Sequence, residues 1–250
     1  MDPNQVRQKL GLDTGKKTVF IFAHIFWDAT FFWGTDLFEN YETWLCDILR
    51  VAARSDHMNW VVKVHPANVV KNKRDGLGSE HGEIEAIHKT LGDIPDHIKI
   101  LAPESDISTL SLFPLMDYCL TVRGTIGIEA ASRGIRVLTA GTGRYDGLGF
   151  TTDFDSKETF LETISHLQDL PEMTASETEL AQRYAYGVFK VRSIPISSVG
   201  FEFRRDSTAQ LETWIDVENQ EQLMQSKDVA LIGDWITSAE EDCCRWDIDN

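Results

Sequence analysis

The sequence predicts an α/β fold with a Rossmann-like, doubly wound parallel sheet. Runs of β-branched and aromatic residues without polar alternation recur through residues 18–140, which is the pattern of strands buried on both faces. Segments with the apolar spacing of amphipathic helices lie between most of these runs. Strands that alternate with helices form parallel sheets covered on both faces. With 42% hydrophobic residues among 250, the chain can bury the core that this fold needs.

The first half of the chain provides three strands and two helices. Trp44, Leu45 and Ile48 have the spacing of one helix face. Pro66 closes the second strand because proline lacks the N–H group that a sheet needs, and Gly92 is a typical residue to follow a helix. The expected elements are, in order, strand 18–26, helix 40–54, strand 59–66, helix 82–92 and strand 97–101.

The second half continues the alternation and then changes character. A helix is expected over residues 106–117, with a kink at Pro114. Ser156 begins a segment with the pattern of a helix cap. The elements expected after residue 117 are strand 118–122, a glycine-rich turn and helix over 124–134, strand 135–140, helices 156–170 and 175–191, an extended segment 195–203 and a helix over 226–238.

Charge divides the chain unevenly. Residues 151–250 carry 21 acidic and 8 basic residues, whereas residues 1–150 carry 19 and 16. An acidic C-terminal part repels nucleic acid and anionic lipid, so no nucleic-acid partner is expected, while the nearly neutral first part can still concentrate positive potential in one cleft. The expected division is a linker-like segment 1–16, a Rossmann-like domain 17–193, and an acidic extension 194–250 to which the sequence assigns no role.

Several classes of protein are not supported by the sequence. The N-terminal residues lack the apolar run of a signal peptide, and no stretch has the roughly 18 apolar residues of a membrane span, so the cytoplasm is the expected location. The four cysteines show no CxxC spacing and no cluster with histidine, which argues against a disulfide framework and a zinc site. Motifs of metalloproteases, P-loop enzymes and serine hydrolases are absent, and neither a metal nor a cofactor is expected.

Candidate site residues follow the expected strands at their carboxyl ends. Ligands of parallel α/β sheets bind at this edge, where loops lead into helices. His24 and Asp28 follow the first strand and are candidates for catalysis. The candidate binding residues are Lys63 and His65 after the second strand, Arg123, Gly124, Thr125 and Glu129 after the fourth, and Gly143, Arg144 and Tyr145 after the fifth.

Most of these candidates have a structural interpretation beside a functional one. Pro66 can hold His65 extended merely to end a strand, or so that His65 donates to a phosphate oxygen. Thr125 is expected to be a helix N-cap. Glu129 can favour the helix dipole from the solvent side, but beside Ile128 a carboxylate needs a partner, such as the two hydroxyl groups of a ribose. Gly124 and Gly127 leave room for a ligand.

The segment "GTGRYDG", residues 141–147, is not a dinucleotide fingerprint. Its glycines are spaced GxGxxxG and no obvious helix follows, so we reject an NAD site. Arg144 remains a phosphate partner and Tyr145 a surface on which a base can stack, with a surface turn as the alternative. The aromatic loop "FWDATFFWG" around Asp28 either lines a cleft or fills a core.

Two stretches of the sequence resemble a known family. "VVKVHPAN" and "TVRGTIGIEAASRGIRVLTAGTGRYDGLGFTTD" are similar to motifs of the capsule polysaccharide biosynthesis proteins, which include bacterial Kdo transferases. The resemblance covers roughly residues 17–165 and implies the C-terminal, nucleotide-sugar-binding domain of a GT-B glycosyltransferase. It implies that His65 and Thr125 contact the donor phosphate, that Glu129 lies near the nucleotide, and that Tyr145 and Gly147 shape the donor loop.

The resemblance also implies a substrate class and a missing partner. The donors of the family are typically CMP-activated acidic sugars, which are transferred to a glycan acceptor without a bound metal. Complete GT-B enzymes have two such domains, so a separate acceptor-binding domain or chain is expected to supply the base, and activity can be at the inner face of the membrane. The first hypothesis is therefore the donor-binding part of a glycosyltransferase. The alternatives are a nucleotide-sugar epimerase and a non-catalytic interaction module.

Overall fold

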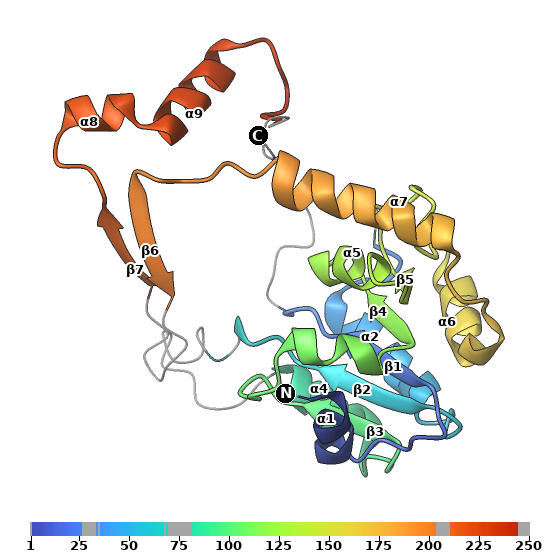
Figure 1. Cartoon of the computed structure of the whole chain (residues 1–250). Helices are drawn as coiled ribbons and strands as arrows, with labels where there is room; N and C mark the ends of the chain where they lie inside the picture. The colour runs from blue at the N-terminus through green and yellow to red at the C-terminus, as the bar shows by residue number, and fades with distance from the viewer. Residues whose placement is uncertain are drawn as a thin grey trace. The chain divides into compact units, whose positions relative to one another are not determined.

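The computed structural model describes residues 2–26, 34, 36–67, 69, 82–203 and 211–244. The chain forms two compact units, Met1–Gln182 and Arg183–Asn250. Figure 1 shows the elements of both units along the chain. The division falls within helix α7, Ala175–Tyr186, whereas the sequence placed a boundary after this helix, at residue 193.

The first unit is built on a five-stranded parallel sheet, as the sequence predicted. The strand order is β3-β2-β1-β4-β5, and all four neighbouring pairs are parallel. This order places the crossover point of the doubly wound fold between β1 and β4. The strands are β1 Thr18–Phe22, β2 Asn59–Lys63, β3 Ile98–Leu101, β4 Tyr118–Thr121 and β5 Arg136–Thr139.

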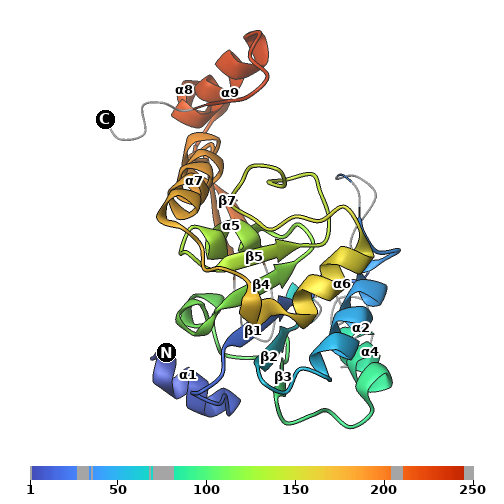
Figure 2. The same cartoon turned by 90° about the vertical axis from the view of Figure 1, so that its right-hand side faces the viewer.

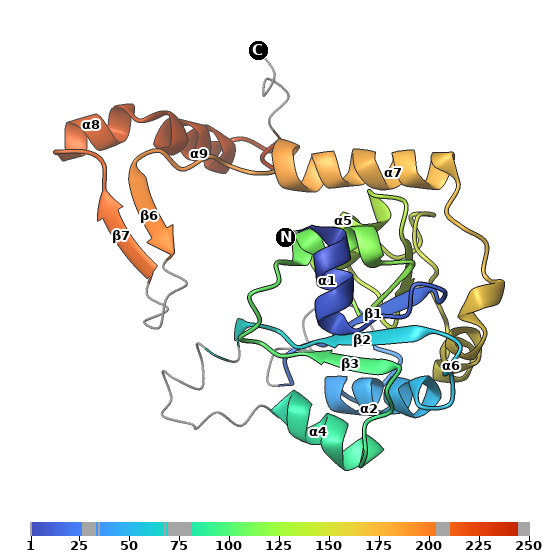
Figure 3. The same cartoon turned by 60° about the horizontal axis from the view of Figure 1, so that its bottom comes forward.

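Helices cover both faces of this sheet. Figures 2 and 3 show α2 and α4 on one face and α1 and α5 on the other. Helix α6 packs against α2. The helices are α1 Pro3–Leu10, α2 Tyr41–Ala52, α4 Gly82–Leu91, α5 Thr125–Ala131 and α6 Lys157–Ser165, followed by α7. In the described part of the chain, no helix has the length and apolar character needed to cross a membrane.

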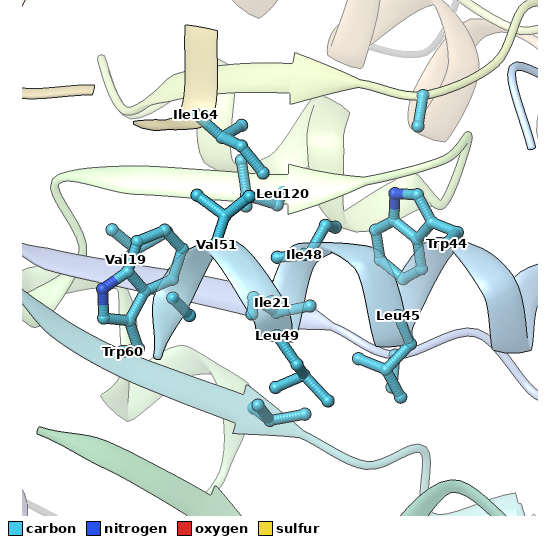
Figure 4. Close-up of a cluster of buried hydrophobic side chains, with 14 of the residues drawn as sticks. Val19, Ile21, Trp44, Leu45, Ile48, Leu49, Val51, Trp60, Leu120 and Ile164 are labelled. Atoms are coloured by element: carbon cyan, nitrogen blue, oxygen red, sulfur yellow. The ribbon is translucent and has the colours of Figure 1, made fainter. Parts of the chain in front are cut away.

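The main core lies between the sheet and helix α2. Val19 and Ile21 point from β1 toward the buried face of α2, while Phe20 is buried on the opposite face of the sheet. This two-sided burial is why the strand sequence shows no polar alternation. Figure 4 shows how Trp44, Leu45, Ile48, Leu49 and Val51 of α2 meet Trp60 of β2, Leu120 of β4 and Ile164 of α6.

The linker-like segment 1–16 contains helix α1. Asp2 caps it by accepting a hydrogen bond from the Asn4 N–H at 2.9 Å, Pro3 occupies its first turn, and Gly11 ends it with φ 61°. Val6 is fully buried. The segment therefore folds with the domain that follows it.

Two local expectations were wrong. Residues 106–117 form two short 3₁₀ helices, Thr109–Ser111 and Phe113–Leu115, because Pro114 has no N–H group to continue an α-helix and Ser108 caps the first turn. Thr125 is not the N-cap of α5. Gly124 takes that position with φ −67° and ψ 150°, without a side-chain cap, and its N–H donates to the Thr121 hydroxyl at 3.2 Å.

The second unit contains a hairpin and two helices. Strands β6 Val199–Phe203 and β7 Leu211–Ile215 are antiparallel, and α8 Gln220–Gln225 and α9 Lys227–Thr237 follow. The residues that link α7 to this hairpin begin with a π-helical turn, Gly187–Val191. The extended segment and the final helix were thus predicted, and the hairpin pairing was not.

Candidate functional site

A cleft of about 710 Å³ lies at the carboxyl edge of the sheet, beside the crossover point between β1 and β4. Most of the predicted site residues line it, so the fold brings them together at one edge of the sheet. From the predicted set, the lining residues are His24, Lys63, His65, Arg123, Gly124, Thr125, Glu129 and Arg144. Asp28 lies outside the described residues, so its position is not discussed.

His24 is held by the strand next to its own. Its Nε2 accepts a hydrogen bond from the Val122 N–H at 3.0 Å and lies 3.0 Å from the Thr121 hydroxyl. The ring stacks on Tyr41 with 4.5 Å between centroids, and Trp44 packs edge-on at 5.7 Å. Burial, followed by the positive charge of Arg123, lowers the pKa of His24 to about 3. The ring is therefore neutral at physiological pH.

His65 and Lys63 come from the end of β2. The Ala67 N–H donates to His65 Nδ1 at 3.1 Å, so in the neutral ring the proton is on Nε2. His65 is exposed, whereas Lys63 is half-buried, and burial lowers the pKa of its ammonium group. No ion-pair partner of Lys63 is found in the described part of the chain.

Arg123 lies behind the cleft and is 6% exposed. Its Nη2 pairs with Asp36 of the loop between β1 and α2, while its Nε and Nη1 are buried without a hydrogen-bond partner among the described residues. Burial lowers the pKa of this guanidinium. Buried donors without acceptors cost free energy, so Arg123 provides a fixed positive charge beside the cleft at some cost in stability.

Glu129 projects from α5 and is the one acidic residue among the described residues that line the cleft. It is half-buried, and no hydrogen bond or ion pair of its carboxylate is found among the described residues. Its backbone carbonyl accepts from the Arg133 side chain at 2.6 Å. Three cationic side chains and one carboxylate therefore face the same space. This charge balance suits a ligand that is anionic and also carries hydroxyl groups.

The family model for capsule polysaccharide biosynthesis proteins matches residues 4–186, which include the whole sheet and the cleft. The chain belongs to this family. Among curated proteins, none matches the chain.

Several solved structures are similar to this member of the capsule polysaccharide biosynthesis family. The UDP-GlcNAc 2-epimerase from Neisseria meningitidis bound to UDP-GlcNAc is 18% identical, with a TM-score of 0.48 over 71% of this chain and 42% of the epimerase. A glycosyltransferase from Rickettsia africae is 11% identical, with a TM-score of 0.43 over 73% of this chain and 44% of the glycosyltransferase. The H444N variant of the wall teichoic acid polymerase TagF is 11% identical, with a TM-score of 0.43 over 73% of this chain and 42% of the polymerase. The chain spans less than half of the length of each.

Two predicted site residues of this family member do not line the cleft. Gly143 is exposed with φ 112°, and its N–H bonds to Asp146 within the turn. Tyr145 is 2% exposed, packs against Phe150 and donates from its hydroxyl to the Gly124 carbonyl at 2.7 Å. Because its ring is buried, Tyr145 is not a surface on which a base can stack, which corrects that interpretation.

The space beside Gly127 is filled by the chain itself. A Cβ atom on Gly127 would lie 2.2 Å from the Tyr145 hydroxyl oxygen. The absence of a side chain at Gly127 therefore makes room for Tyr145 and not for a ligand. This corrects the expectation that Gly127 leaves room for a ligand. Tyr145 supports the turn that carries Arg123, Gly124 and Thr125 into the cleft.

Three residues of the site were missed in the sequence. Thr121 and Tyr41 hold His24, and Asp36 holds Arg123. Thr121 had a detectable signal, because it is a hydroxyl residue near the carboxyl end of the predicted strand YCLTV, just before Arg123. Asp36 and Tyr41 had none, since their role depends on contacts across the fold.

Metal sites and hollows elsewhere in the described structure are the other candidates for a functional site. In the described part of the chain, no group of histidine, cysteine or acidic side chains is arranged to hold a metal ion. A hollow of about 410 Å³ lies between α2 and α6. Of the charges that line it, Asp47 is paired with both Arg50 and Lys157.

Proposed function

We propose that this chain is the donor-binding part of a glycosyltransferase that builds capsular or surface polysaccharide, with a nucleotide sugar as the donor. The observation that carries the proposal is the cleft at the crossover of β1 and β4, where Lys63, Arg123 and Arg144 face one carboxylate. This is the edge of a doubly wound sheet at which nucleotides bind. Membership of the capsule polysaccharide family supports the pathway.

The side chains divide into two groups in this proposal. His65, Thr125 and Arg144 contact the donor phosphate, because all three line the cleft and His65 presents a protonated Nε2. Glu129 accepts hydrogen bonds from the ribose hydroxyl groups, which satisfies a carboxylate that has no partner among the described residues. We propose a CMP-activated donor first and a UDP-activated donor second.

Sugar transfer breaks the bond between the anomeric carbon of the sugar and a phosphate oxygen. The electron pair of this bond stays on the phosphate, so negative charge grows there as the acceptor oxygen attacks. Fixed cations and N–H donors stabilise that charge. We propose that Lys63, Arg123 and Arg144 do so without a metal or cofactor, and that a separate acceptor-binding domain or chain supplies the base and the glycan acceptor.

The proposed location is the cytoplasm, including the inner face of the membrane, because the proposed donor is a nucleotide sugar. Fractionation of cells that express the chain would show it in the cytosolic fraction or loosely attached to inner membranes. Recovery of the chain on the outer side of the inner membrane would contradict this location. Nucleotide binding is tested separately.

Calorimetry with CMP and UDP tests nucleotide binding. The full chain is expected to bind one of them, and His65→Ala is expected to weaken binding by about 10-fold, since a hydrogen bond to a charged group contributes about 1.5 kcal/mol or more. His57→Ala is the matched control, because His57 precedes β2 at the opposite edge and bonds to Gln168. Absence of heat at millimolar nucleotide would reject the proposed function.

A further inference from the structure

His24 is fixed in one tautomer by backbone geometry. The Val122 N–H points at Nε2 from 3.0 Å, and a second proton on Nε2 would face this donor and leave the amide without an acceptor. The Thr121 hydroxyl accepts from the Gly124 N–H at 3.2 Å, so its own hydrogen can point at the same Nε2, 3.0 Å away. Nε2 is therefore an acceptor, and the ring proton is on Nδ1.

His24 lines the cleft together with Gly124. A Cβ atom on Gly124 would lie 3.7 Å from Cε1 of His24, the carbon between the two ring nitrogens. No hydrogen-bond partner of Nδ1 is found in the described part of the chain. The nitrogens that are buried there without a partner belong to Trp44 and Arg123, so Nδ1 is accessible from the cleft.

We propose that His24 binds the ligand by donating its Nδ1–H to a ligand oxygen and does not serve as the proton acceptor of the reaction. The proposal deepens the proposed function and rests on it for the identity of the ligand. A general base needs a free lone pair on the side of the substrate. The one lone pair of the neutral His24 ring is already engaged with the Val122 N–H.

The charges around the ring favour the same state. Burial is the largest cause that disfavours the imidazolium form of His24, and Arg123 at the end of β4, His65 at the end of β2 and Arg144 at the end of β5 add to it. Tyr41 of α2 covers one face of the ring. A cationic His24 is thus opposed from every neighbouring strand, and His24 acts as a neutral donor beside the permanent cations.

Long-range ¹H–¹⁵N correlation spectra of the full chain test the tautomer directly, with His24→Gln used to assign the signals. We expect a protonated Nδ1 and an unprotonated Nε2 that stay unchanged from pH 5 to pH 8. Addition of CMP or UDP is expected to shift the Nδ1 signal. A protonated Nε2, or a ring that titrates between pH 5 and pH 8, would overturn the proposal.

Two substitutions separate the two nitrogens. His24→Gln places an amide near Nε2, where it can still accept from Val122, and removes the donor from the cleft. His24→Asn places an amide near Nδ1. We expect His24→Gln to weaken CMP or UDP binding about 10-fold to 100-fold, with a smaller loss for His24→Asn, provided that thermal melting shows both variants folded.

The possible outcomes separate this inference from the proposed function. If nucleotide binds to the parent and His24→Gln binds equally well, the role of His24 is rejected and the proposed function stands. If neither CMP nor UDP binds to the parent, the proposed function and the ligand contact are rejected together. The spectrum of the free protein then still decides whether His24 is the fixed Nδ1–H tautomer.

Discussion

Gly127 and Tyr145 compete for the same space at the turn after β4. A Cβ atom at residue 127 would lie 2.2 Å from Oη and 2.7 Å from Cζ of Tyr145, and the ring cannot move away easily because it is buried against Phe150. We expect Gly127→Ala to lower the free energy of unfolding by about 1 to 3 kcal/mol through overpacking. Tyr145→Phe, which removes the bond to Gly124, is expected to cost about 1 kcal/mol.

The double variant makes this prediction specific. Removal of Oη relieves the closest contact, so Gly127→Ala should cost less in the Tyr145→Phe background than in the parent. Denaturant unfolding measures all four proteins. Gly233→Ala in α9 serves as the control, because nothing lies within 4 Å of its added Cβ. Strict additivity of the two changes would show that the two residues do not compete.

The sequence predicted which types of residue lie at the site better than it predicted what each of them does there. Histidine, lysine and arginine after buried strands indicated a positively charged edge, since parallel strands end together. The contacts that hold them were hidden, because His24 and Val122 are 98 residues apart and Arg123 and Asp36 are 87 apart. Tyr145 was assigned to the ligand because a sequence does not show on which side of a turn a ring is buried.

At the scale of elements, one ion pair fastens α7 to the sheet. Arg136 of β5 donates to Glu177 at 2.8 and 3.3 Å, and also to the carbonyl groups of Pro171 and Glu172. Arg136 is nearly buried, and its side chain, together with Thr174, lowers the pKa of Glu177 from 4.5 to about 2. Folding therefore favours the ionised carboxylate, and this stabilisation is lost as the pH falls from 4.5 toward 2.

Glu177→Gln tests this attachment. We expect it to lower the free energy of unfolding by about 1 to 3 kcal/mol at neutral pH, because Arg136 loses a charged partner. The difference from the parent should shrink as the pH falls from 4.5 toward 2, where the parent carboxylate is protonated. Glu179→Gln on the same helix is the control. A difference that is constant with pH would contradict the role of the charge.

The elements themselves were predicted wherever the pattern was strong. All five strands of the sheet were found because burial on both faces leaves an uninterrupted apolar run. The segment 106–117 was misjudged because its apolar spacing suits a helix, and the missing N–H of Pro114 was treated as a kink and not as a stop. The pairing of β6 with β7 was not predicted, because the sequence between them has no short turn motif that indicates a hairpin.

At the scale of the whole molecule, every described residue of the cleft belongs to the first unit. The second unit has its own anchor. Asp228 of α9 is 2% exposed and accepts hydrogen bonds from the backbone N–H groups of Ser197 and Ser198 at 3.0 and 2.9 Å, and from the Ser198 hydroxyl at 2.6 Å. The Ser198 hydroxyl and these N–H groups hold the pKa of Asp228 well below its usual range.

Asp228→Ala therefore tests whether the second unit affects the first. It leaves buried N–H and hydroxyl donors of Ser198 without an acceptor, so amide hydrogen exchange should become faster in residues 195–203 and 211–237. Exchange in residues 1–182 and the affinity for CMP or UDP are expected to stay unchanged, because the cleft lies in the first unit. Asp234→Ala, at an exposed position of the same helix, controls for the loss of charge. If Asp228→Ala also weakened nucleotide binding, the second unit would be part of the binding machinery, and the cleft described above would be incomplete without it.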